Sequence, residues 1–517
     1  MSKGLKIPPE VQDVMQKLRQ AGFESYAVGG CVRDLLLGIG PRDWDVTTSA
    51  KPEEILGLFE DSFYENKFLT VTVKTGSEDP VLSEIEITTY RAEGKYTDKR
   101  HPDDVRFAKT LAEDLSRRDF TVNAMAMDLA GKIADIFGGR EDLEKKIIRA
   151  VGEPAGRFEE DALRMIKAVR MVAQLGFTME EKTAEAIKKL SGNVEFVSSE
   201  RIRDELVKIL LAPRAKEAVE LLHNLGLLKH IMPELEEGLG IDQRGPHKYQ
   251  VWEHSLLALD YAVRQNWSLQ IRLSALLHDV GKPRTRERRN NIWTFYGHDV
   301  VGAKMTLVIL ARLCFPAREA ETIARLVRWH LFSYHLRRDD QFMADMWAMG
   351  EDPREKDIED AEEEMQETTD SAIRRLIQRV GADTIEDLVK VRICDRIATG
   401  VPKAVPYRLR HFQFRVEKII REGEATNVKM LKVRGEDILQ ILKISPGPKV
   451  GYILDALLEE VLDDPARNNR EYLLEQMTKL GKLSDEELQK LREQSREKVE
   501  GLERAREGEI KKKYHVK

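Results

Sequence analysis

The sequence is poor in cysteine and contains no long hydrophobic run. Its three cysteines, Cys31, Cys314 and Cys394, are scattered without metal-ligand spacing, and this odd, sparse set predicts a reducing, cytoplasmic location. No stretch approaches the length of a membrane span, and the first residues lack the apolar core of a signal peptide. We therefore expect no membrane partner.

Aromatic residues and net positive charge are also scarce. Aromatics make up 7% of the chain, against 34% charged and 42% hydrophobic residues, a balance typical of largely helical proteins. The net charge of −6 argues mildly against a nucleic-acid partner, but phosphate contacts need only a local basic surface. Basic clusters occur at residues 99–101, 117–118 and 511–513. The composition thus neither requires RNA nor excludes it.

The length predicts several domains, because 517 residues exceed what one ordinary core accommodates. We expect a multidomain protein with an α/β head over residues 1–147, built as a small sheet flanked by helices. Mostly all-α segments are expected to follow at 148–235, 236–400 and 401–517. The sequence does not indicate an oligomeric state.

A glycine pair opens the most informative stretch of the head. The apolar run Tyr26–Val28 leads into Gly29 and Gly30, and a helix is predicted from Val32 onward. Glycine lets the backbone approach a ligand closely, and a helix N-terminus favours a phosphate. We therefore expect a phosphate cradle at this turn.

Paired carboxylates follow at Asp43 and Asp45, on a strand-like run over residues 42–47. Alternate residues of a strand share a face, so the two side chains are expected to point together. Such a pair can hold Mg²⁺, which takes one or two carboxylates and completes its shell with water and substrate phosphate. Glu86, on another predicted strand, is a third candidate. The cradle and the pair suggest metal-assisted transfer of a nucleotide or phosphoryl group.

The pattern Gly-Gly-x-Val-Arg-Asp followed by Asp-x-Asp resembles the signature of a known superfamily of nucleotidyltransferases. This superfamily includes the bacterial class II tRNA nucleotidyltransferases and the related bacterial poly(A) polymerases. The resemblance implies addition of CCA to the 3′ end of tRNA from CTP and ATP, with Mg²⁺ on the aspartate pair. It also implies that Gly30 and Arg33 contact the nucleotide. The full-length loop from Arg91 to Lys109 argues, by the same resemblance, against an enzyme that adds only CC.

Two arginines follow in the stretch Asp114–Ala126. We expect Ser116 to cap a helix that carries Arg117 and Arg118, because serine is a preferred N-cap residue. Paired guanidinium groups suit triphosphate binding, since each can make two parallel hydrogen bonds to phosphate oxygens. The stretch resembles the second motif of the family, which implies a nucleotide contact for Arg118.

A long helix is predicted over residues 156–177, ended by a glycine. In it, Asp161, Arg164, Lys167 and Arg170 recur every third residue, so each lags the last by about 60° around the axis. Asp161 and Arg164 are then neighbours, while Arg170 lies near the opposite side.

The Glu-Asp-x-x-Arg pattern at 160–164 resembles the base-reading motif of the family. The resemblance implies that Asp161 accepts a hydrogen bond from the exocyclic amine of C or A while Arg164 donates to ring acceptors. Arg170 is expected to support the helix or contact phosphates. Lys167 departs from the arginine that the family usually shows, and lysine lacks the planar fork of arginine. That contact, and the balance between C and A, stays open.

Histidine and aspartate recur in the third segment in a pattern that suits a divalent metal. His278 and Asp279 are adjacent in a predicted apolar helix, where both would be costly unless bound to something. The run His-Asp-x-Gly-Lys resembles the HD phosphohydrolase superfamily. The ligands that this resemblance implies are His254, His278, Asp279 and Asp395. His298 and His330 are candidates for a second metal.

Three functions remain open. The first is a CCA-adding tRNA nucleotidyltransferase that also carries an HD phosphohydrolase activity on RNA ends. The second is an enzyme that adds only A, either to tRNA or as a poly(A) polymerase. The third is an HD phosphohydrolase whose head merely binds RNA. For the C-terminal segment the resemblance implies contacts with tRNA, while the charged stretches 359–367 and 484–517 are expected to be solvated or partly disordered helices.

Overall fold

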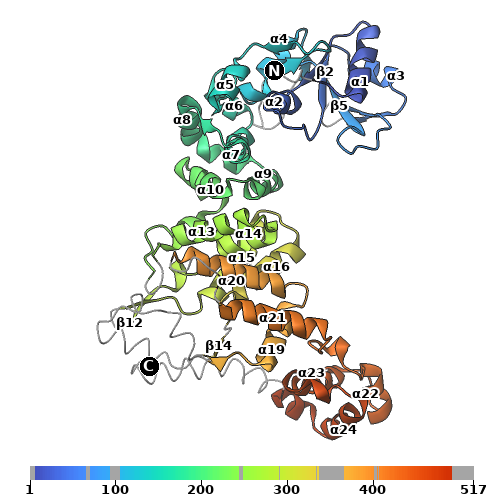
Figure 1. Cartoon of the computed structure of the whole chain (residues 1–517), viewed down its shortest axis with the longest axis vertical. Helices are drawn as coiled ribbons and strands as arrows, with labels where there is room; N and C mark the ends of the chain where they lie inside the picture. The colour runs from blue at the N-terminus through green and yellow to red at the C-terminus, as the bar shows by residue number, and fades with distance from the viewer. Residues whose placement is uncertain are drawn as a thin grey trace.

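The chain is elongated in the computed structural model, with a sheet-containing head at one end and helices throughout the rest (Figure 1). The structure describes residues 6–65, 70–93, 105–243, 248–289, 292–332, 335–336, 366–400, 405 and 407–491. Most of the predicted 91–109 loop, most of the acidic stretch 359–367 and the tail beyond 491 lie outside these residues. Within the described part, no helix is both long and apolar enough to cross a membrane.

A mixed sheet forms the head, with its described strands in the order β3-β4-β5-β2-β1-β8-β9. β2 and β5 run parallel, and the other neighbours are antiparallel. The strands are β1 (Ser25–Val28), β2 (Asp45–Thr48), β3 (Ser62–Glu65), β4 (Thr70–Lys74), β5 (Glu84–Thr89), β8 (Met125–Met127) and β9 (Ile133–Asp135). Short pairs form between β6 (Arg91–Glu93) and β7 (Val105–Phe107), and between β10 (Ile147–Ile148) and β11 (Thr178–Met179).

Helices flank this sheet, as the α/β pattern predicts. They are α1 (Pro9–Gln20), α2 (Gly30–Leu36), α3 (Pro52–Leu58), α4 (Leu111–Ser116), α5 (Gly139–Lys145) and the 3₁₀ turn η1 (Thr121–Asn123). Apolar residues of β2 and β5 such as Val46 and Ile87 are fully buried. Their burial holds the two strands in register, and Asp45 is thereby paired across the ladder with Glu86.

The predicted strand over residues 42–47 is shorter than expected. β2 begins at Asp45, and Asp43 lies exposed in a bend before it. Trp44 between them is buried in the head core, only 3% exposed. The two aspartates therefore do not share a strand face, although the charge of Asp43 is close enough to raise the pKa of Asp45.

The predicted helix that would begin at Ser116 is wrong, because Ser116 is the last residue of α4. The N-cap is Thr110, whose hydroxyl accepts a hydrogen bond from the backbone N–H of Glu113 at 3.3 Å. The Glu113 carboxylate accepts one from the backbone N–H of Thr110 in return, which completes a capping box. Arg117 and Arg118 consequently follow the helix instead of lying within it.

The predicted helix over 156–177 is two helices, α6 (Pro154–Glu160) and α7 (Leu163–Leu175). Asp161 is extended between them, with φ −142° and ψ 104°, and its Oδ1 accepts a hydrogen bond from the backbone N–H of Leu163 at 3.1 Å. An aspartate that caps the next helix competes with helix continuation. The angular argument that made Asp161 and Arg164 helix neighbours is therefore wrong, whereas the predicted end at Gly176 is confirmed by its left-handed φ of 69°.

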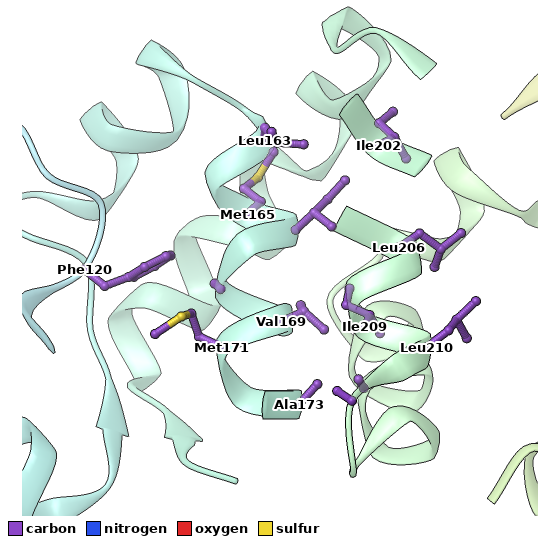
Figure 2. Packing of buried hydrophobic residues seen from close by; sticks show 14 of the residues in the cluster. Phe120, Leu163, Met165, Val169, Met171, Ala173, Ile202, Leu206, Ile209 and Leu210 are labelled. Atoms are coloured by element: carbon purple, nitrogen blue, oxygen red, sulfur yellow. The ribbon is translucent and has the colours of Figure 1, made fainter. Parts of the chain in front are cut away.

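Helix α7 lies between the head and α9 (Ser199–Leu211). Val169 and Ala173 of α7 face Leu206 and Ile209 of α9, while Met171 extends toward Phe120 of the head (Figure 2). The helical region from α6 to α12 is termed the neck. Its further elements are α8 (Glu181–Leu190), η2 (Ser191–Phe196), α10 (Ala215–Asn224), α11 (Leu228–Ile231) and α12 (Pro233–Glu236). Apolar packing thus fixes the start of α9 against the start of α7.

The rest of the described chain is almost entirely helical. The layer after the neck contains α13 (Val251–Arg264), α14 (Leu269–Leu277), η3 (Pro283–Thr285), β12 (Glu287–Arg289), β13 (Ile292–Thr294), α15 (His298–Arg312), α16 (Ala317–Trp329), β14 (His335–Leu336), β15 (Gln366–Glu367), α19 (Asp370–Val380) and α20 (Ile385–Ala398). The C-terminal elements are α21 (Tyr407–Arg421), η4 (Val428–Met430), α22 (Gly435–Leu442), α23 (Pro448–Asp463), η5 (Pro465–Arg467) and α24 (Arg470–Leu480). Helix α14 ends before the predicted Gly281, so His278 lies at its C-cap.

Candidate active site and metal centre

The glycine pair forms a crowded turn between β1 and α2. Gly29 has φ 85° and ψ −130°, a conformation that is essentially restricted to glycine. A Cβ at Gly29 would lie 2.8 Å from Nη1 of Arg118 and 3.8 Å from Oδ2 of Asp45. A Cβ at Gly30 would lie 3.6 Å from Nη2 of Arg33. The turn therefore brings bare backbone against a carboxylate and two guanidinium groups.

Asp45 is the most buried member of the head's carboxylate group. Burial, together with the charges of Asp43 and Glu86, raises the pKa of Asp45 to about 6, although Arg118 acts in the opposite direction. The three carboxylates do not form a tight set of ligand atoms within the described residues. One or two carboxylates are nevertheless enough for Mg²⁺, which takes its other ligands from water and phosphate. A cation would relieve the repulsion that raises this pKa.

Asp114, which sequence reasoning did not single out, anchors the arginine pair. Its buried Oδ1 accepts hydrogen bonds from Nε and Nη2 of Arg117 at 2.9 and 2.8 Å, and Arg118 lies 3.8 Å from its Oδ2. The hydroxyl of Thr47 also donates to Oδ2, at 3.1 Å. Burial raises the pKa of Asp114, but the two guanidinium groups outweigh it and hold that pKa below its usual value. The carboxylate thus stays charged and holds both arginines beside β2.

Arg33 connects α2 to two other elements of the site. Its Nη1 donates to Oδ1 of Asn123 at 2.7 Å and lies 3.9 Å from the sulfur of Met171 on α7. Its Nη2 forms an ion pair with Asp34 at 2.7 Å. Arg33 is thereby held where the glycine turn, η1 and the neck helix meet.

Asp161 and Arg164 of the Glu-Asp-x-x-Arg pattern have different partners. Oδ2 of Asp161 accepts a hydrogen bond from Nη2 of Arg201 at 2.8 Å. Arg164 is buried and donates to Glu160 at 2.6 Å and to the backbone carbonyl of Arg117 at 3.2 Å. Arg201, on α9, was not singled out from the sequence as a partner of Asp161. The same contacts tie the neck to the arginine pair of the head.

Lys167 and Arg170 also face different surroundings. Burial raises the pKa of Asp119, and the charges of Lys167 and Arg164 outweigh it, so that pKa lies below its usual value. Arg170 forms an ion pair with Glu205 of α9 at 3.1 Å. The charge of Lys167 therefore stabilises the carboxylate of Asp119 in the head, while Arg170 holds α7 against α9.

Three histidines between α14 and α16 point the same ring nitrogen, Nε2, toward Asp279. Nδ1 of His278, His298 and His330 lies 2.8, 2.7 and 2.6 Å from the backbone carbonyls of Ala275, Phe295 and Val327. A carbonyl only accepts, so each Nδ1 carries a proton, which leaves Nε2 as the nitrogen that can bind a metal when it is deprotonated. Nε2 of His298 and of His330 is buried and, among the described residues, has no hydrogen-bond donor. This is the arrangement that a metal-binding histidine requires.

The aspartates complete two sets of buried ligand atoms. In each set the atoms lie within 4.8 Å of one another: His254, His278 and Asp395 in one, and Asp279, His298 and His330 in the other. Nε2 of His278 lies 3.2 Å from Oδ2 of Asp279 and 3.7 Å from Oδ1 of Asp395. All six predicted residues are thus brought together, although Asp395 is far from the histidines in sequence. The nitrogen and oxygen donors fit one or two divalent cations.

The histidines and aspartates of this centre shift one another's pKa values. Burial lowers the pKa of His278, but the carboxylates of Asp279 and Asp395 outweigh it and raise that pKa to about 10. Burial also lowers the pKa of His330, which stays well below its usual value. The pKa values of both aspartates lie well below their usual value despite burial, because His278 and other groups stabilise their charged forms. The buried carboxylates are therefore held charged by neighbouring positive groups, chiefly His278, with Lys282 beside Asp279 and Arg392 beside Asp395.

A second glycine contact positions His298. A Cβ at Gly281 would lie 2.2 Å from the carbonyl oxygen of His298 and 2.6 Å from the backbone nitrogen of Gly302. The Gly281–Gly302 approach lets the first turn of α15 pack against the end of α14. The glycine in His-Asp-x-Gly-Lys is thus required for backbone contact beside the metal ligands.

We expect Gly29→Ala to destabilise the protein by about 1–3 kcal/mol, because alanine is strained at this φ and ψ and its Cβ collides with Arg118. The free energy of unfolding in urea measures the loss. Gly22→Ala is the matched control, since Gly22 also has a positive φ of 91° but nothing within 4 Å of the added Cβ. Equal losses in the two variants would contradict the crowding at Arg118.

Sequence models of known families match four consecutive parts of the chain. Residues 25–149 match "Poly A polymerase head domain" and 176–239 match "Probable RNA and SrmB- binding site of polymerase A". Residues 251–400 match "HD domain", and 397–477 match a second domain of tRNA nucleotidyltransferases. The matches follow the order of the head, neck, metal centre and C-terminal helices.

Among relatives, the A-adding tRNA nucleotidyltransferase of Deinococcus radiodurans is 32% identical over 446 residues, covering 84% of this chain and 90% of that protein. The CCA-adding enzyme of Lactobacillus helveticus is 52% identical over 209 residues, which cover 40% of this chain. The chain spans about half the length, 51%, of this CCA-adding relative.

Solved structures agree in fold. The CCA-adding enzyme of Bacillus stearothermophilus in complex with CTP is 26% identical with a TM-score of 0.61, covering 92% of this chain and 98% of that one. The Thermotoga maritima CCA-adding enzyme complexed with tRNA is 20% identical with a TM-score of 0.51, covering 92% and 96%.

Proposed function

Because this chain belongs to the family of tRNA nucleotidyltransferases and bacterial poly(A) polymerases, we propose that it adds CCA to the 3′ end of tRNA from CTP and ATP. The observation that supports this most is the convergence of Gly29, Asp45 and Arg118 at one point of the head. Bare backbone, a carboxylate and a guanidinium are what a triphosphate with its cation needs.

In the head, Asp43 and Asp45 are assigned to hold Mg²⁺. Mg²⁺ held there would supply the positive charge that activates the 3′-hydroxyl of the RNA and neutralises the pyrophosphate leaving group. Arg33 and Arg118 are assigned to the phosphates, because guanidinium makes paired hydrogen bonds to phosphate oxygens. Gly30 leaves room for the nucleotide to approach the backbone. Glu86, paired with Asp45 across the ladder, is a candidate third carboxylate.

In the neck, Asp161 and Arg164 are assigned to read the base. A carboxylate accepts from the exocyclic amine of C or A, and arginine donates to ring acceptors, so G and U present the wrong pattern. Arg201 already holds one oxygen of Asp161 at 2.8 Å, which fixes the direction of its remaining lone pairs. The charge of Lys167 acts on Asp119, as that of Arg164 does, and Arg170 supports α7 through its ion pair with Glu205.

The second candidate is an enzyme that adds only A. A specific observation favours it, because the A-adding relative matches 84% of this chain whereas the first CCA-adding relative matches 40%. The two candidates share the same head chemistry. They differ in whether CTP is a substrate.

We expect the purified protein to incorporate C when given CTP and tRNA that lacks CCA, and to add A only after C has been added. Labelled CTP and ATP, supplied separately and together and resolved on a sequencing gel, measure this directly. The control is tRNA that already ends in CC, to which either candidate adds A. Failure to incorporate any C, with A still added to the CC-ending tRNA, contradicts CCA addition and leaves the A-only enzyme.

For the centre between α13 and α20 we propose a metal-dependent phosphohydrolase activity on RNA ends. The buried set of histidine and aspartate ligand atoms within 4.8 Å supports it. A divalent metal held by these residues would supply an activated water and polarise the phosphate. A phosphohydrolase that uses the head only to bind RNA is less well supported, because the head keeps its carboxylates and arginines.

A further inference from the structure

An arginine-rich hairpin follows the ligand Asp279 and ends just before the ligand His298. Residues 284–296, which contain β12 and β13, are termed the arginine hairpin. They include four arginines, at 284, 286, 288 and 289, and three aromatic residues, at 293, 295 and 296, whereas Glu287 is their only carboxylate. In the strand pair, Arg288 lies opposite Trp293. The metal ligands alone do not account for this concentration of cations and rings.

Both ends of the arginine hairpin are attached to metal ligands. Nζ of Lys282, two residues before it, donates to Oδ2 of Asp279 at 2.6 Å. Nδ1 of His298 donates to the carbonyl of Phe295 at 2.7 Å, and Nζ of Lys282 lies 5.9 Å from the centroid of the Phe295 ring. Trp293 is two residues from Phe295, about 7 Å along an extended strand. The hairpin therefore begins beside the metal centre and leads away from it.

The guanidinium of Arg286 lies over the indole ring of Trp293. Its carbon is 3.9 Å from the ring centroid, and that of Arg288 is 5.9 Å from the same centroid. A guanidinium that lies on a ring face keeps the N–H groups at its own edge available to donate. Nε of Arg286 is buried and has no hydrogen-bond partner among the described residues. Trp293 thus holds this guanidinium in place without satisfying its donors.

Arg284 shows how another arginine of the same segment is neutralised. Its Nε and Nη2 donate to the two carboxylate oxygens of Glu237 at 2.9 and 2.7 Å. Arg286 and Arg288 form no ion pair within the described ranges, and Glu287 between them points to the other face, because side chains alternate along a strand. A buried donor without a partner costs stability. Support of the hairpin explains the ring contact of Arg286, but not its unpaired Nε.

An unpaired guanidinium edge identifies the class of ligand. It matches two oxygens of one phosphate, with which it makes paired hydrogen bonds. Lys282 and Phe295 separate Arg286 from the metal ligands along the hairpin, so the phosphate that it meets is not the one at the metal centre. An RNA chain carries a further phosphate at every nucleotide, whereas a nucleoside cyclic phosphate has one only. We propose that Arg286, held by Trp293, binds an internucleotide phosphate of the RNA whose terminal phosphate is hydrolysed at the metal centre.

This inference rests on the proposed phosphohydrolase activity and adds to it a preference for RNA chains over free nucleotides. The test uses a trinucleotide and a nucleoside, each ending in a 2′,3′-cyclic phosphate. Water opens the ring of either one by cleaving one P–O bond, which leaves a phosphate monoester and a free hydroxyl. The trinucleotide alone offers internucleotide phosphates to Arg286. The ratio of the two kcat/KM values therefore reports the proposed contact, while the nucleoside value reports the metal centre itself.

We expect Arg286→Ala to lower the ratio of trinucleotide to nucleoside kcat/KM by at least about tenfold, since a hydrogen-bonded charge pair is lost. The loss should appear in the KM of the trinucleotide, while the nucleoside value stays close to that of the wild type. Arg284→Ala is the matched control and should keep the ratio, because Glu237 already occupies the donors of Arg284. The trinucleotide value should also fall more steeply with salt in the wild type than in Arg286→Ala, because phosphate contacts depend on counterion release.

Variants of Trp293 test its role as the support of Arg286. Trp293→Ala should lower the same ratio, because the guanidinium loses the ring that holds it. Trp293→Phe should keep most of the ratio, because a phenyl ring still offers a flat face to the guanidinium. Loss of nucleoside hydrolysis in step with trinucleotide hydrolysis contradicts a separate phosphate contact, since the segment also carries the Phe295 carbonyl that holds His298.

A binding measurement avoids turnover, because a trinucleotide without a terminal phosphate gives the metal centre nothing to hydrolyse. This trinucleotide is added to the metal-loaded protein, and amide hydrogen exchange is followed by mass spectrometry. Exchange over residues 284–296 is expected to slow in the wild type and in Arg284→Ala, but not in Arg286→Ala. The unphosphorylated nucleoside is the ligand control and should not slow it.

A ratio that Arg286→Ala leaves unchanged overturns the inference, and so does the absence of any slowing of exchange in the wild type. The proposed phosphohydrolase activity fails by a different result, in which the wild type hydrolyses neither substrate with any divalent metal. The exchange measurement stays readable in that case, so the two proposals can fail separately.

Discussion

Replacing Asp43 and Asp45 together by alanine is expected to abolish incorporation of both CTP and ATP into tRNA that lacks CCA. Without either carboxylate the head retains no close pair to hold Mg²⁺ beside the glycine turn. Loss of a bound metal removes several kcal/mol of transition-state stabilisation, which corresponds to a rate lower by at least about a thousandfold. Transfer of labelled nucleotide at saturating CTP or ATP measures the effect.

The single variants discriminate between the two carboxylates. Asp45 is more buried, lies beside Arg118 and faces Glu86 across the ladder, whereas Asp43 is exposed in a bend. We therefore expect Asp45→Asn to be the more damaging. Asp13→Ala with Asp61→Ala, two exposed carboxylates of the head, is the matched control and should keep full activity. Incorporation retained by the double variant at Asp43 and Asp45 would refute the metal assignment.

Short-range patterns of the head were predictable from sequence. The alternation of buried and exposed residues at 84–89 and the glycine turn at 29–30 both depend on neighbouring residues only. The proline that begins α3 is likewise a local signal. The family resemblance is confirmed by the relative that is 32% identical over 84% of this chain and 90% of its own length. The domain boundaries near 147, 235 and 400 stay predictions.

Helix ends and long-range partners were not predictable in the same way. Two local capping signals compete near Ser116, and the capping box at Thr110 prevails because it satisfies two backbone donors at once. At Asp161, periodicity continues through the break, so the pattern alone cannot reveal it. The Asp161–Arg201 contact arises from packing of α7 on α9, which no local pattern encodes. Asp114 is similarly defined only by the arginines and strands around it.

The second large effect is expected from His278→Ala, which should abolish metal-dependent hydrolysis of a 2′,3′-cyclic nucleotide. Nε2 of His278 lies 3.0 Å from Nε2 of His254 and 3.2 Å from Oδ2 of Asp279, so it occupies the middle of the ligand set. Its loss removes a metal ligand and leaves the buried carboxylate of Asp279 without its nearest imidazole. Hydrolysis assayed with several divalent metals measures the effect, and metal titration followed by calorimetry reports binding independently of turnover.

The same variant separates the two activities of the chain. The helices α7–α10 lie between the head and the α13–α16 layer (Figure 1), so nucleotide incorporation should survive His278→Ala if the variant folds. His278→Gln, which keeps more of the side-chain volume, guards against a loss caused by misfolding, and thermal unfolding checks both variants. His223→Ala, which removes a partly exposed histidine paired with Glu236, is the control and should keep hydrolysis. Absence of hydrolysis by the wild type with every metal tested would reduce the centre to a structural role, because its ligand set would then stabilise the fold without reaching a substrate phosphate.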